Sequence, residues 1–127
     1  MKQILDRYTL RPLTSDLWSK MQRFAAVVRL RPEKESEYRA LHAAAWPGVL
    51  ATLKRANIGN YSIFVRDGLL FSYLEYTGTD YAADTAQIAA DPVTREWWTL
   101  TDPCQQPLDS ADEGQLWAPA EEVFHLD

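Results

Sequence analysis

The chain has 127 residues, which is enough for one domain with a single hydrophobic core. Its hydrophobic content (46%) and charged content (24%) are ordinary for a globular protein, and a formal net charge of −5 excludes the basic surface that nucleic-acid binding requires. The single cysteine, Cys104, excludes an internal disulfide, and with only His42 and His125 beside it there is no metal-ligand motif, so we expect no metal and no cofactor.

The N-terminal stretch does not resemble a secretory or membrane segment. Its apolar residues are interrupted by Asp6, Arg7 and Arg11, so the apolar core of a signal peptide is missing. The longest apolar runs of the chain are also far too short to cross a bilayer. We therefore expect a cytoplasmic protein.

The first regular elements are a strand and two helices. Residues 23–30 predict a strand, because alternate positions on one face are apolar: Phe24, Ala26, Val28 and Leu30. Pro32 suits a first helical turn, and this helix should run to about Ala45, because a residue before a proline is disfavoured in the helical region. Pro47 can then begin a second helix, which ends between Asn57 and Gly59.

The first helix carries three aromatic side chains on one face. Tyr38, His42 and Trp46 are spaced by four residues, which stacks them along the helix axis. A histidine can accept and donate protons near neutral pH, so His42 is a candidate acid/base group. The alternative is a structural histidine, which is the more common role of a single histidine on a helix.

A β-hairpin follows, with strands at residues 60–65 and 69–76 around the tight connection at residues 66–68. Within it, Tyr61 shares a face with Ile63 and Val65, a pattern typical of a side chain that points into a core or a cavity.

The last third of the chain predicts two helices, a loop and a strand. A helix is expected at residues 80–90, and Asp91 should cap a short second helix with Pro92 at its first position. Its adjacent residues Trp97 and Trp98 would point about 100° apart, so we expect one in the core and the other at a pocket or rim. We interpret residues 101–120 as an ordered loop and residues 121–126 as the terminal strand, in which His125 is expected to be structural.

The order β-α-β-β-α-β predicts an α+β, ferredoxin-like fold in which helices cover one face of a four-stranded antiparallel sheet. The other face would be uncovered, and we expect two copies of the chain to pack there as a homodimer. A nucleophile motif, a phosphate-binding glycine loop and a carboxylate pair are all missing, so an enzyme of this kind would use proton transfer and ring stacking.

Five segments, in this order, resemble the L-rhamnose mutarotase family: EYRALHAAAWP, NYSIF, LLFSYLEY, DPVTREWW and EEVFHLD, which together span residues 23–127. The resemblance implies a cytoplasmic dimeric enzyme that interconverts the α and β anomers of a 6-deoxy sugar. It places the acid/base histidine at His42 and the sugar contacts at Tyr38, Tyr61, Trp97 and Trp98. Trp46, in the WP dipeptide, is expected to support the pocket.

The chain also departs from the family pattern at two places. Three alanines, residues 43–45, follow His42 where the family has a more polar segment, and Gly48 stands where a carboxylate often follows the WP dipeptide. Both changes affect pocket shape more than chemistry. L-fucose or another 6-deoxy sugar is therefore an alternative substrate to L-rhamnose.

Other classes of function remain open. The same scaffold carries non-catalytic small-molecule-binding modules, and it also carries monooxygenases, which the residues here disfavour because His125 would be the only other obvious haem ligand. Residues 1–22 form an extension outside the resemblance. Either Met21 is the native start, or residues 1–20 form an amphipathic arm that uses Leu10, Leu13, Leu17 and Trp18.

Overall fold

The computed structural model describes residues 21–127. The two hypotheses for residues 1–20 fall outside this range. The strands are β1 (Gln22–Leu30), β2 (Ile58–Arg66), β3 (Leu69–Tyr76), β4 (Gln105–Gln106) and β5 (Ala118–Pro119). The helices are η1 (Pro32–Lys34), α2 (Glu35–Ala43), α3 (Pro47–Arg55), α4 (Tyr81–Ala90), α5 (Pro92–Thr101) and η2 (Asp102–Cys104).

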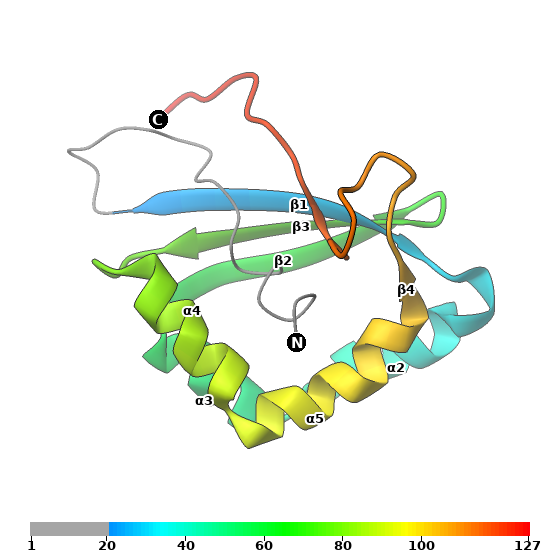
Figure 1. Ribbon diagram of the computed structural model, residues 1–127, viewed down its shortest axis with the longest axis horizontal. Coiled ribbons are helices and arrows are strands. Elements are labelled where there is room, and N and C mark those ends of the chain that lie inside the picture. Colours follow the sequence, from blue (N-terminus) through cyan, green and yellow to red (C-terminus); the bar gives the residue numbers. More distant parts are fainter. Residues whose placement is uncertain (1–20) are drawn as a thin grey trace.

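The strands form one antiparallel sheet in the order β2-β3-β1-β4, and β5 also pairs with β1. The four α-helices lie on one side of this sheet, as Figure 1 shows. This arrangement confirms the α+β, ferredoxin-like fold that the order of elements predicts. It gives the sheet a helix face, which bears the core, and an open face on the opposite side.

The core forms where alternate strand residues meet the helices. On β1 the residues that the sequence assigns to one face, Phe24, Ala26, Val28 and Leu30, are all buried. Leu70 of β3 is paired with Val28, and Leu74 with Phe24, so these apolar side chains lie side by side on the helix face.

Short-range signals in the sequence fix the hairpin and the helix starts. Asp67 and Gly68 both have positive φ, 53° and 73°, as the two central residues of a type I′ hairpin turn require. Asp80 accepts a hydrogen bond from the backbone N–H of Ala83 at 3.1 Å, and Asp91 accepts one from Thr94 at 2.9 Å. Both aspartates therefore cap their helices, as predicted for Asp91.

Some predicted boundaries are wrong. The helix expected from Pro32 to Ala45 begins with the 3₁₀ turn η1, and α2 ends at Ala43. Residues 121–126 are irregular, and the last strand is the short β5, because the chain leaves β1 after the amide of Ala120 donates to Ala25. Residues that favour strands do not form one where no neighbouring strand offers hydrogen bonds.

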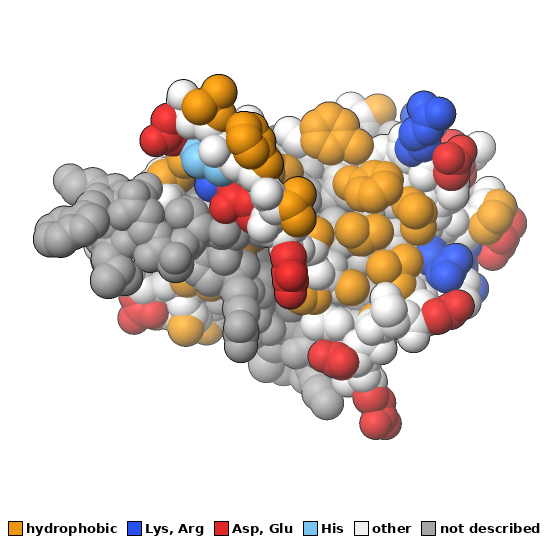
Figure 2. Space-filling model, turned by 90° about the horizontal axis from the view of Figure 1, so that it is seen from above, with side chains coloured by type: hydrophobic (Ala, Val, Ile, Leu, Met, Phe, Trp, Pro, Cys, Tyr) orange, Lys and Arg blue, Asp and Glu red, His pale blue; other side chains and the backbone are white. Residues whose placement is uncertain are grey.

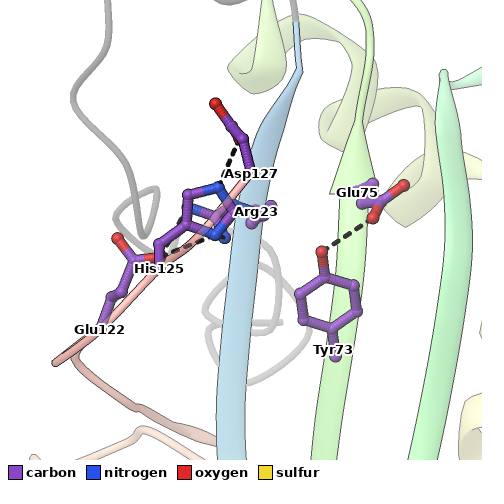
Figure 3. A network of polar contacts seen from close by, with 6 residues as sticks. All are labelled: Arg23, Tyr73, Glu75, Glu122, His125 and Asp127. Atoms are coloured by element: carbon purple, nitrogen blue, oxygen red, sulfur yellow. Dashed lines mark hydrogen bonds and ion pairs between the residues drawn. The ribbon is translucent and has the colours of Figure 1, made fainter.

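The irregular C-terminal segment is held to the sheet by charged contacts (Figure 3). Arg23 of β1 forms an ion pair with Glu122 at 2.6 Å and also contacts Nδ1 of His125, whose Nε2 lies 2.8 Å from Asp127. We call Arg23, Glu122, His125 and Asp127 the tail cluster. These contacts are the kind that the structural role expected for His125 requires.

A second polar group adjoins the tail cluster on β3. The hydroxyl of Tyr73 donates to Glu75 at 2.8 Å, and Glu75 also accepts a hydrogen bond from Asn60 at 2.9 Å. Burial and the bond to Glu75 raise the pKa of Tyr73 to about 12, so its hydroxyl stays protonated over the neutral range.

The open face carries exposed apolar side chains between these polar groups. Phe64 of β2 is 61% exposed, and its cross-strand neighbour Phe71 of β3 is 38% exposed. Figure 2 views the molecule from the side opposite the helices and shows hydrophobic side chains gathered over the sheet. Exposed aromatic pairs of this kind are typical of a surface that is covered in an assembly.

Candidate active site

The helical spacing of Tyr38 and His42 produces a ring stack on α2. The ring centroids of Tyr38 and His42 lie 4.2 Å apart and are tilted by 30°. Trp97 of α5 meets the His42 ring edge-on at 5.3 Å, and Trp46 meets Trp97 in the same way at 5.3 Å. These four side chains form one continuous wall with the imidazole in its middle. The prediction that Trp46 shares one helix face with Tyr38 and His42 is wrong, because α2 ends at Ala43 and Trp46 is the extended residue that caps α3.

The imidazole is oriented by its own helix. Nδ1 of His42 lies 2.9 Å from the carbonyl oxygen of Tyr38, one turn earlier. A carbonyl can only accept, so Nδ1 carries the proton in this contact and the lone pair of a neutral ring is on Nε2. This bond fixes both the tautomer and the direction of the ring, as a proton-transferring histidine requires.

The aromatic wall borders a cavity of about 500 Å³ between α2, α3, α5 and the helix face of the sheet. This volume lies within the range of small-molecule sites. The described residues around the cavity are Leu30, Tyr38, Arg39, His42, Ala43, Leu50, Tyr61, Ile63, Phe64, Val65, Leu70 and Trp97. There is no carboxylate in this set, so the described groups that could move a proton are one imidazole and two phenols.

The structure brings together most of the residues that the sequence singles out. Tyr38, His42, Tyr61 and Trp97 all border the cavity. Trp98 does not: it is buried beside them in the core, which is the division expected for two adjacent residues on a helix.

Trp46 also lies outside the cavity lining and packs on Trp97 from behind. That is the position of a supporting residue.

Within residues 21–127 there is no group of three or more His, Cys, Asp or Glu side chains that could hold a metal ion.

Several cavity residues were missed by sequence reasoning. Leu30, Leu50 and Leu70 look like ordinary core residues in the sequence, and only the tertiary structure puts them around a cavity. Ile63 and Val65 could be found, because they alternate with Tyr61 along β2. Arg39 borders the cavity while its guanidinium bonds Glu35 at 2.9 Å.

The two departures from the family pattern have different positions. Ala43 borders the cavity, so a small side chain here directly affects its shape. Gly48 instead lies where α3 approaches α5, and a Cβ at this position would be 3.1 Å from Cγ1 of Val93. A larger residue at position 48 would require Val93 to move. The packing of α3 against α5 therefore favours glycine at this position.

The sequence profile of the L-rhamnose mutarotase family matches residues 23–126. Among curated relatives, the L-rhamnose mutarotase of Sinorhizobium fredii is 36% identical, and the match covers 84% of this chain and 99% of the relative. The chain belongs to the L-rhamnose mutarotase family. The family's member from Lactiplantibacillus plantarum is 32% identical over 84% of this chain and 100% of its own length.

Solved structures agree with this family fold. The L-rhamnose mutarotase of Formosa agariphila superposes with a TM-score of 0.63 at 23% identity, covering 83% of this chain and 98% of that one. The tetracenomycin F2 cyclase of Streptomyces glaucescens has a TM-score of 0.58 at 15% identity, with coverage of 83% and 98%. Identities this low show a shared fold and no more.

Within the described part of the chain, no helix has the length and apolar character needed to span a membrane.

Proposed function

We propose that this protein is a cytoplasmic isomerase that interconverts the α and β pyranose anomers of L-rhamnose, with no metal and no cofactor. The observation that carries the proposal is the position of His42. Its ring is oriented by a backbone carbonyl, belongs to an aromatic wall and lies at the edge of a cavity of about 500 Å³. We assign the activity to residues 23–127 and treat residues 1–22 as an extension outside the family domain.

The reaction needs only proton transfers. One group protonates the ring oxygen while another removes the proton of the anomeric hydroxyl, and the bond between C1 and the ring oxygen breaks to give the open-chain aldehyde. Rotation about the C1–C2 bond presents the other face of the carbonyl, and the reverse transfers close the ring. We assign one of these transfers to His42. A phenol, from Tyr38 or Tyr61, or a bound water supplies the other.

The remaining cavity residues match the two surfaces of a 6-deoxy sugar. The indole of Trp97 offers a flat apolar face for the C–H side of the pyranose, with Trp98 behind it in the core. Ile63, Val65 and Leu70 form an apolar corner that suits the methyl group at C6.

L-fucose is the second candidate substrate. Ala43 leaves space beside His42, and this space can admit a sugar whose hydroxyl configuration differs from that of L-rhamnose. Both substrates use the same chemistry, because mutarotation involves only C1 and the ring oxygen.

We also propose that the working unit is a homodimer. The exposed pair Phe64 and Phe71 on the open face supports this, since a second copy packed sheet to sheet would remove both from water. Val123, Phe124 and Leu126 of the C-terminal segment, which are exposed at 97%, 78% and 80%, would add to the contact.

Saturation-transfer NMR between the anomeric protons of L-rhamnose, and separately of L-fucose, tests the proposal. The wild-type protein should catalyse exchange, and His42→Ala should reduce the rate by about 100-fold or more. Exchange that survives this substitution would remove His42 from the mechanism. Binding without exchange for both sugars would favour the non-catalytic module.

A further inference from the structure

The residues around the cavity differ in how far they are exposed, and this difference locates its mouth. The floor is formed by side chains that are at most 5% exposed: Leu30, Tyr38, Leu70 and Trp97. Four other lining residues are exposed, and we call them the cavity rim: Arg39 and Ala43 of α2, Leu50 of α3 and Phe64 of β2. A residue that borders a cavity and also meets solvent lies at its opening.

Arg39 is the polar member of the cavity rim, since the other members are an alanine, a leucine and a phenylalanine. Its side chain is 60% exposed. Arg39 lies three residues before His42 and four before Ala43, so the three side chains are neighbours on the surface of α2. The small side chain of Ala43 leaves open the space beside the guanidinium that a larger residue would fill.

The guanidinium of Arg39 has one nitrogen engaged and two available. Nε donates to Oε2 of Glu35, one turn earlier, at 2.9 Å. Within residues 21–127 no hydrogen bond or ion pair engages the terminal nitrogens Nη1 and Nη2. Glu35 is not among the residues around the cavity, so it holds Nε without occupying the space of a ligand. The N–H groups of both terminal nitrogens are therefore available to a ligand at the rim.

A monosaccharide needs these donors. The proposed reaction uses His42 and a phenol or a water at C1 and the ring oxygen, which leaves the hydroxyls at C2, C3 and C4. Apart from His42 and the two phenols, Arg39 is the one polar side chain among the described residues around the cavity. A sugar hydroxyl that loses water without gaining a partner weakens binding, and a charged donor is a strong replacement.

We propose that Arg39 is a substrate-binding residue, which donates hydrogen bonds from its terminal nitrogens to a hydroxyl oxygen of the sugar. Glu35 is its positioning residue, because the bond to Nε restricts the guanidinium before the sugar arrives. This inference rests on the proposed function and adds to it a residue to which the family resemblance gives no role. Arg39 thus contributes to affinity and to the choice of sugar, while proton transfer belongs to His42.

Binding and stability should separate at this pair. Arg39 and Glu35 form an exposed i, i+4 ion pair, which contributes little to the stability of a helix. Removing either side chain should therefore hardly change the unfolding temperature. Removing Arg39 should weaken sugar binding, and removing Glu35 should do so only while Arg39 is present. A pair that served only α2 would leave the affinity for the sugar unchanged.

The experiment compares Arg39→Met, Glu35→Met and the double variant with the control Arg29→Met. Arg29 also forms an exposed ion pair, with Asp109 at 3.4 Å, but does not border the cavity. NMR titration measures the dissociation constant for L-rhamnose. We expect Arg39→Met to weaken binding by about tenfold and Glu35→Met by about twofold. The double variant should match Arg39→Met, and Arg29→Met should match the wild type.

Mono-deoxy analogues of L-rhamnose then identify the hydroxyl concerned. The wild type and Arg39→Met should bind equally well to the analogue that lacks the hydroxyl bound by Arg39. Unchanged affinity in Arg39→Met, or an equal loss in Arg29→Met, would overturn the role of Arg39. A further loss of affinity in the double variant would overturn the positioning role of Glu35. Failure of the proposed function looks different: the wild type itself would then catalyse no exchange.

Discussion

The two histidines of this protein lie on opposite faces of the sheet, and their contacts differ accordingly. His42, on the helix face, bonds a backbone carbonyl through Nδ1 and contacts the rings of Tyr38 and Trp97 at the edge of the cavity. His125, on the open face, has Arg23 against Nδ1 and Asp127 against Nε2.

This difference shows how environment separates the histidine proposed to transfer protons from the one that holds the C-terminal segment. Both nitrogens of His125 are engaged by charged groups of the same chain, which hold the C-terminal segment to β1. His42 is oriented by a neutral acceptor, the backbone carbonyl of Tyr38. Four predictions test whether activity depends on the helix face while assembly and the hold on the C-terminal segment depend on the open face.

The largest effect should come from exchanging each histidine for glutamine. His42→Gln should lower the exchange rate of L-rhamnose anomers by about 100-fold to 10,000-fold, because glutamine cannot transfer the proton. His125→Gln should leave that rate unchanged. Saturation-transfer NMR on both variants measures the contrast, and a comparable loss in His125→Gln would show that the open face takes part in the chemistry.

The open face should instead control assembly. Phe71→Asp places a charge in the proposed sheet-to-sheet contact and should weaken dimerisation by about 100-fold or more. Leu100→Asp is the matched control, since Leu100 is an exposed apolar residue of α5 on the helix side. Sedimentation velocity should find Phe71→Asp monomeric and Leu100→Asp dimeric at micromolar concentration. A dimeric Phe71→Asp would refute the proposed contact.

The tail cluster should matter for stability. Arg23→Met leaves Glu122 without its cation in a largely buried position and should cost about 2 kcal/mol of unfolding free energy. Arg29→Met is the control, because its ion pair with Asp109 is exposed and should be worth less than about 0.5 kcal/mol. Urea unfolding measures both. Equal stabilities would mean that the cluster does not hold the segment.

The smallest effect concerns pH. Hydrogen bonds from Asn60 and Tyr73, together with nearby Arg23, hold the pKa of Glu75 below its ordinary value of 4.5. A lowered folded pKa gives stability that is present above pH 4.5 and is lost as the pH falls through the folded pKa. Glu75→Gln should therefore be slightly less stable at pH 7 and should lose less stability between pH 5 and pH 3. Urea unfolding midpoints measured at pH 7, 5 and 3 test this prediction. If Glu75→Gln loses as much stability as the wild type between pH 5 and pH 3, Glu75 does not contribute to the acid sensitivity.

The sequence predicts elements well where the signal is local. The Asp67-Gly68 turn, the Asp91 cap and the proline at the start of α3 each act on a few neighbouring residues, and all three are found. The terminal strand fails for the opposite reason. Residues 121–126 include the strand-forming residues Val123 and Phe124, but strand formation depends on a distant edge with free hydrogen-bonding groups.

The candidate site divides in the same way. The i, i+4 spacing of Tyr38 and His42 suffices to stack their rings, because helix geometry brings such side chains together in any context. Neither the cavity nor the choice between Trp97 and Trp98 follows from spacing. The cavity and the choice of tryptophan depend on how α5 is rotated against α2 and the sheet. The buried N–H donors of Gln105 and Trp117 that have no partner among the described residues likewise arise only from tertiary packing.

What the sequence by itself determined is the order of elements, the family and the residues able to transfer protons, since periodicity, capping and residue chemistry are local properties. The tertiary structure alone decided which of these residues share a cavity and which face of the sheet the helices leave uncovered. Packing between elements far apart in the chain sets both. For that reason His42 and His125, alike in chemistry, lie in opposite environments.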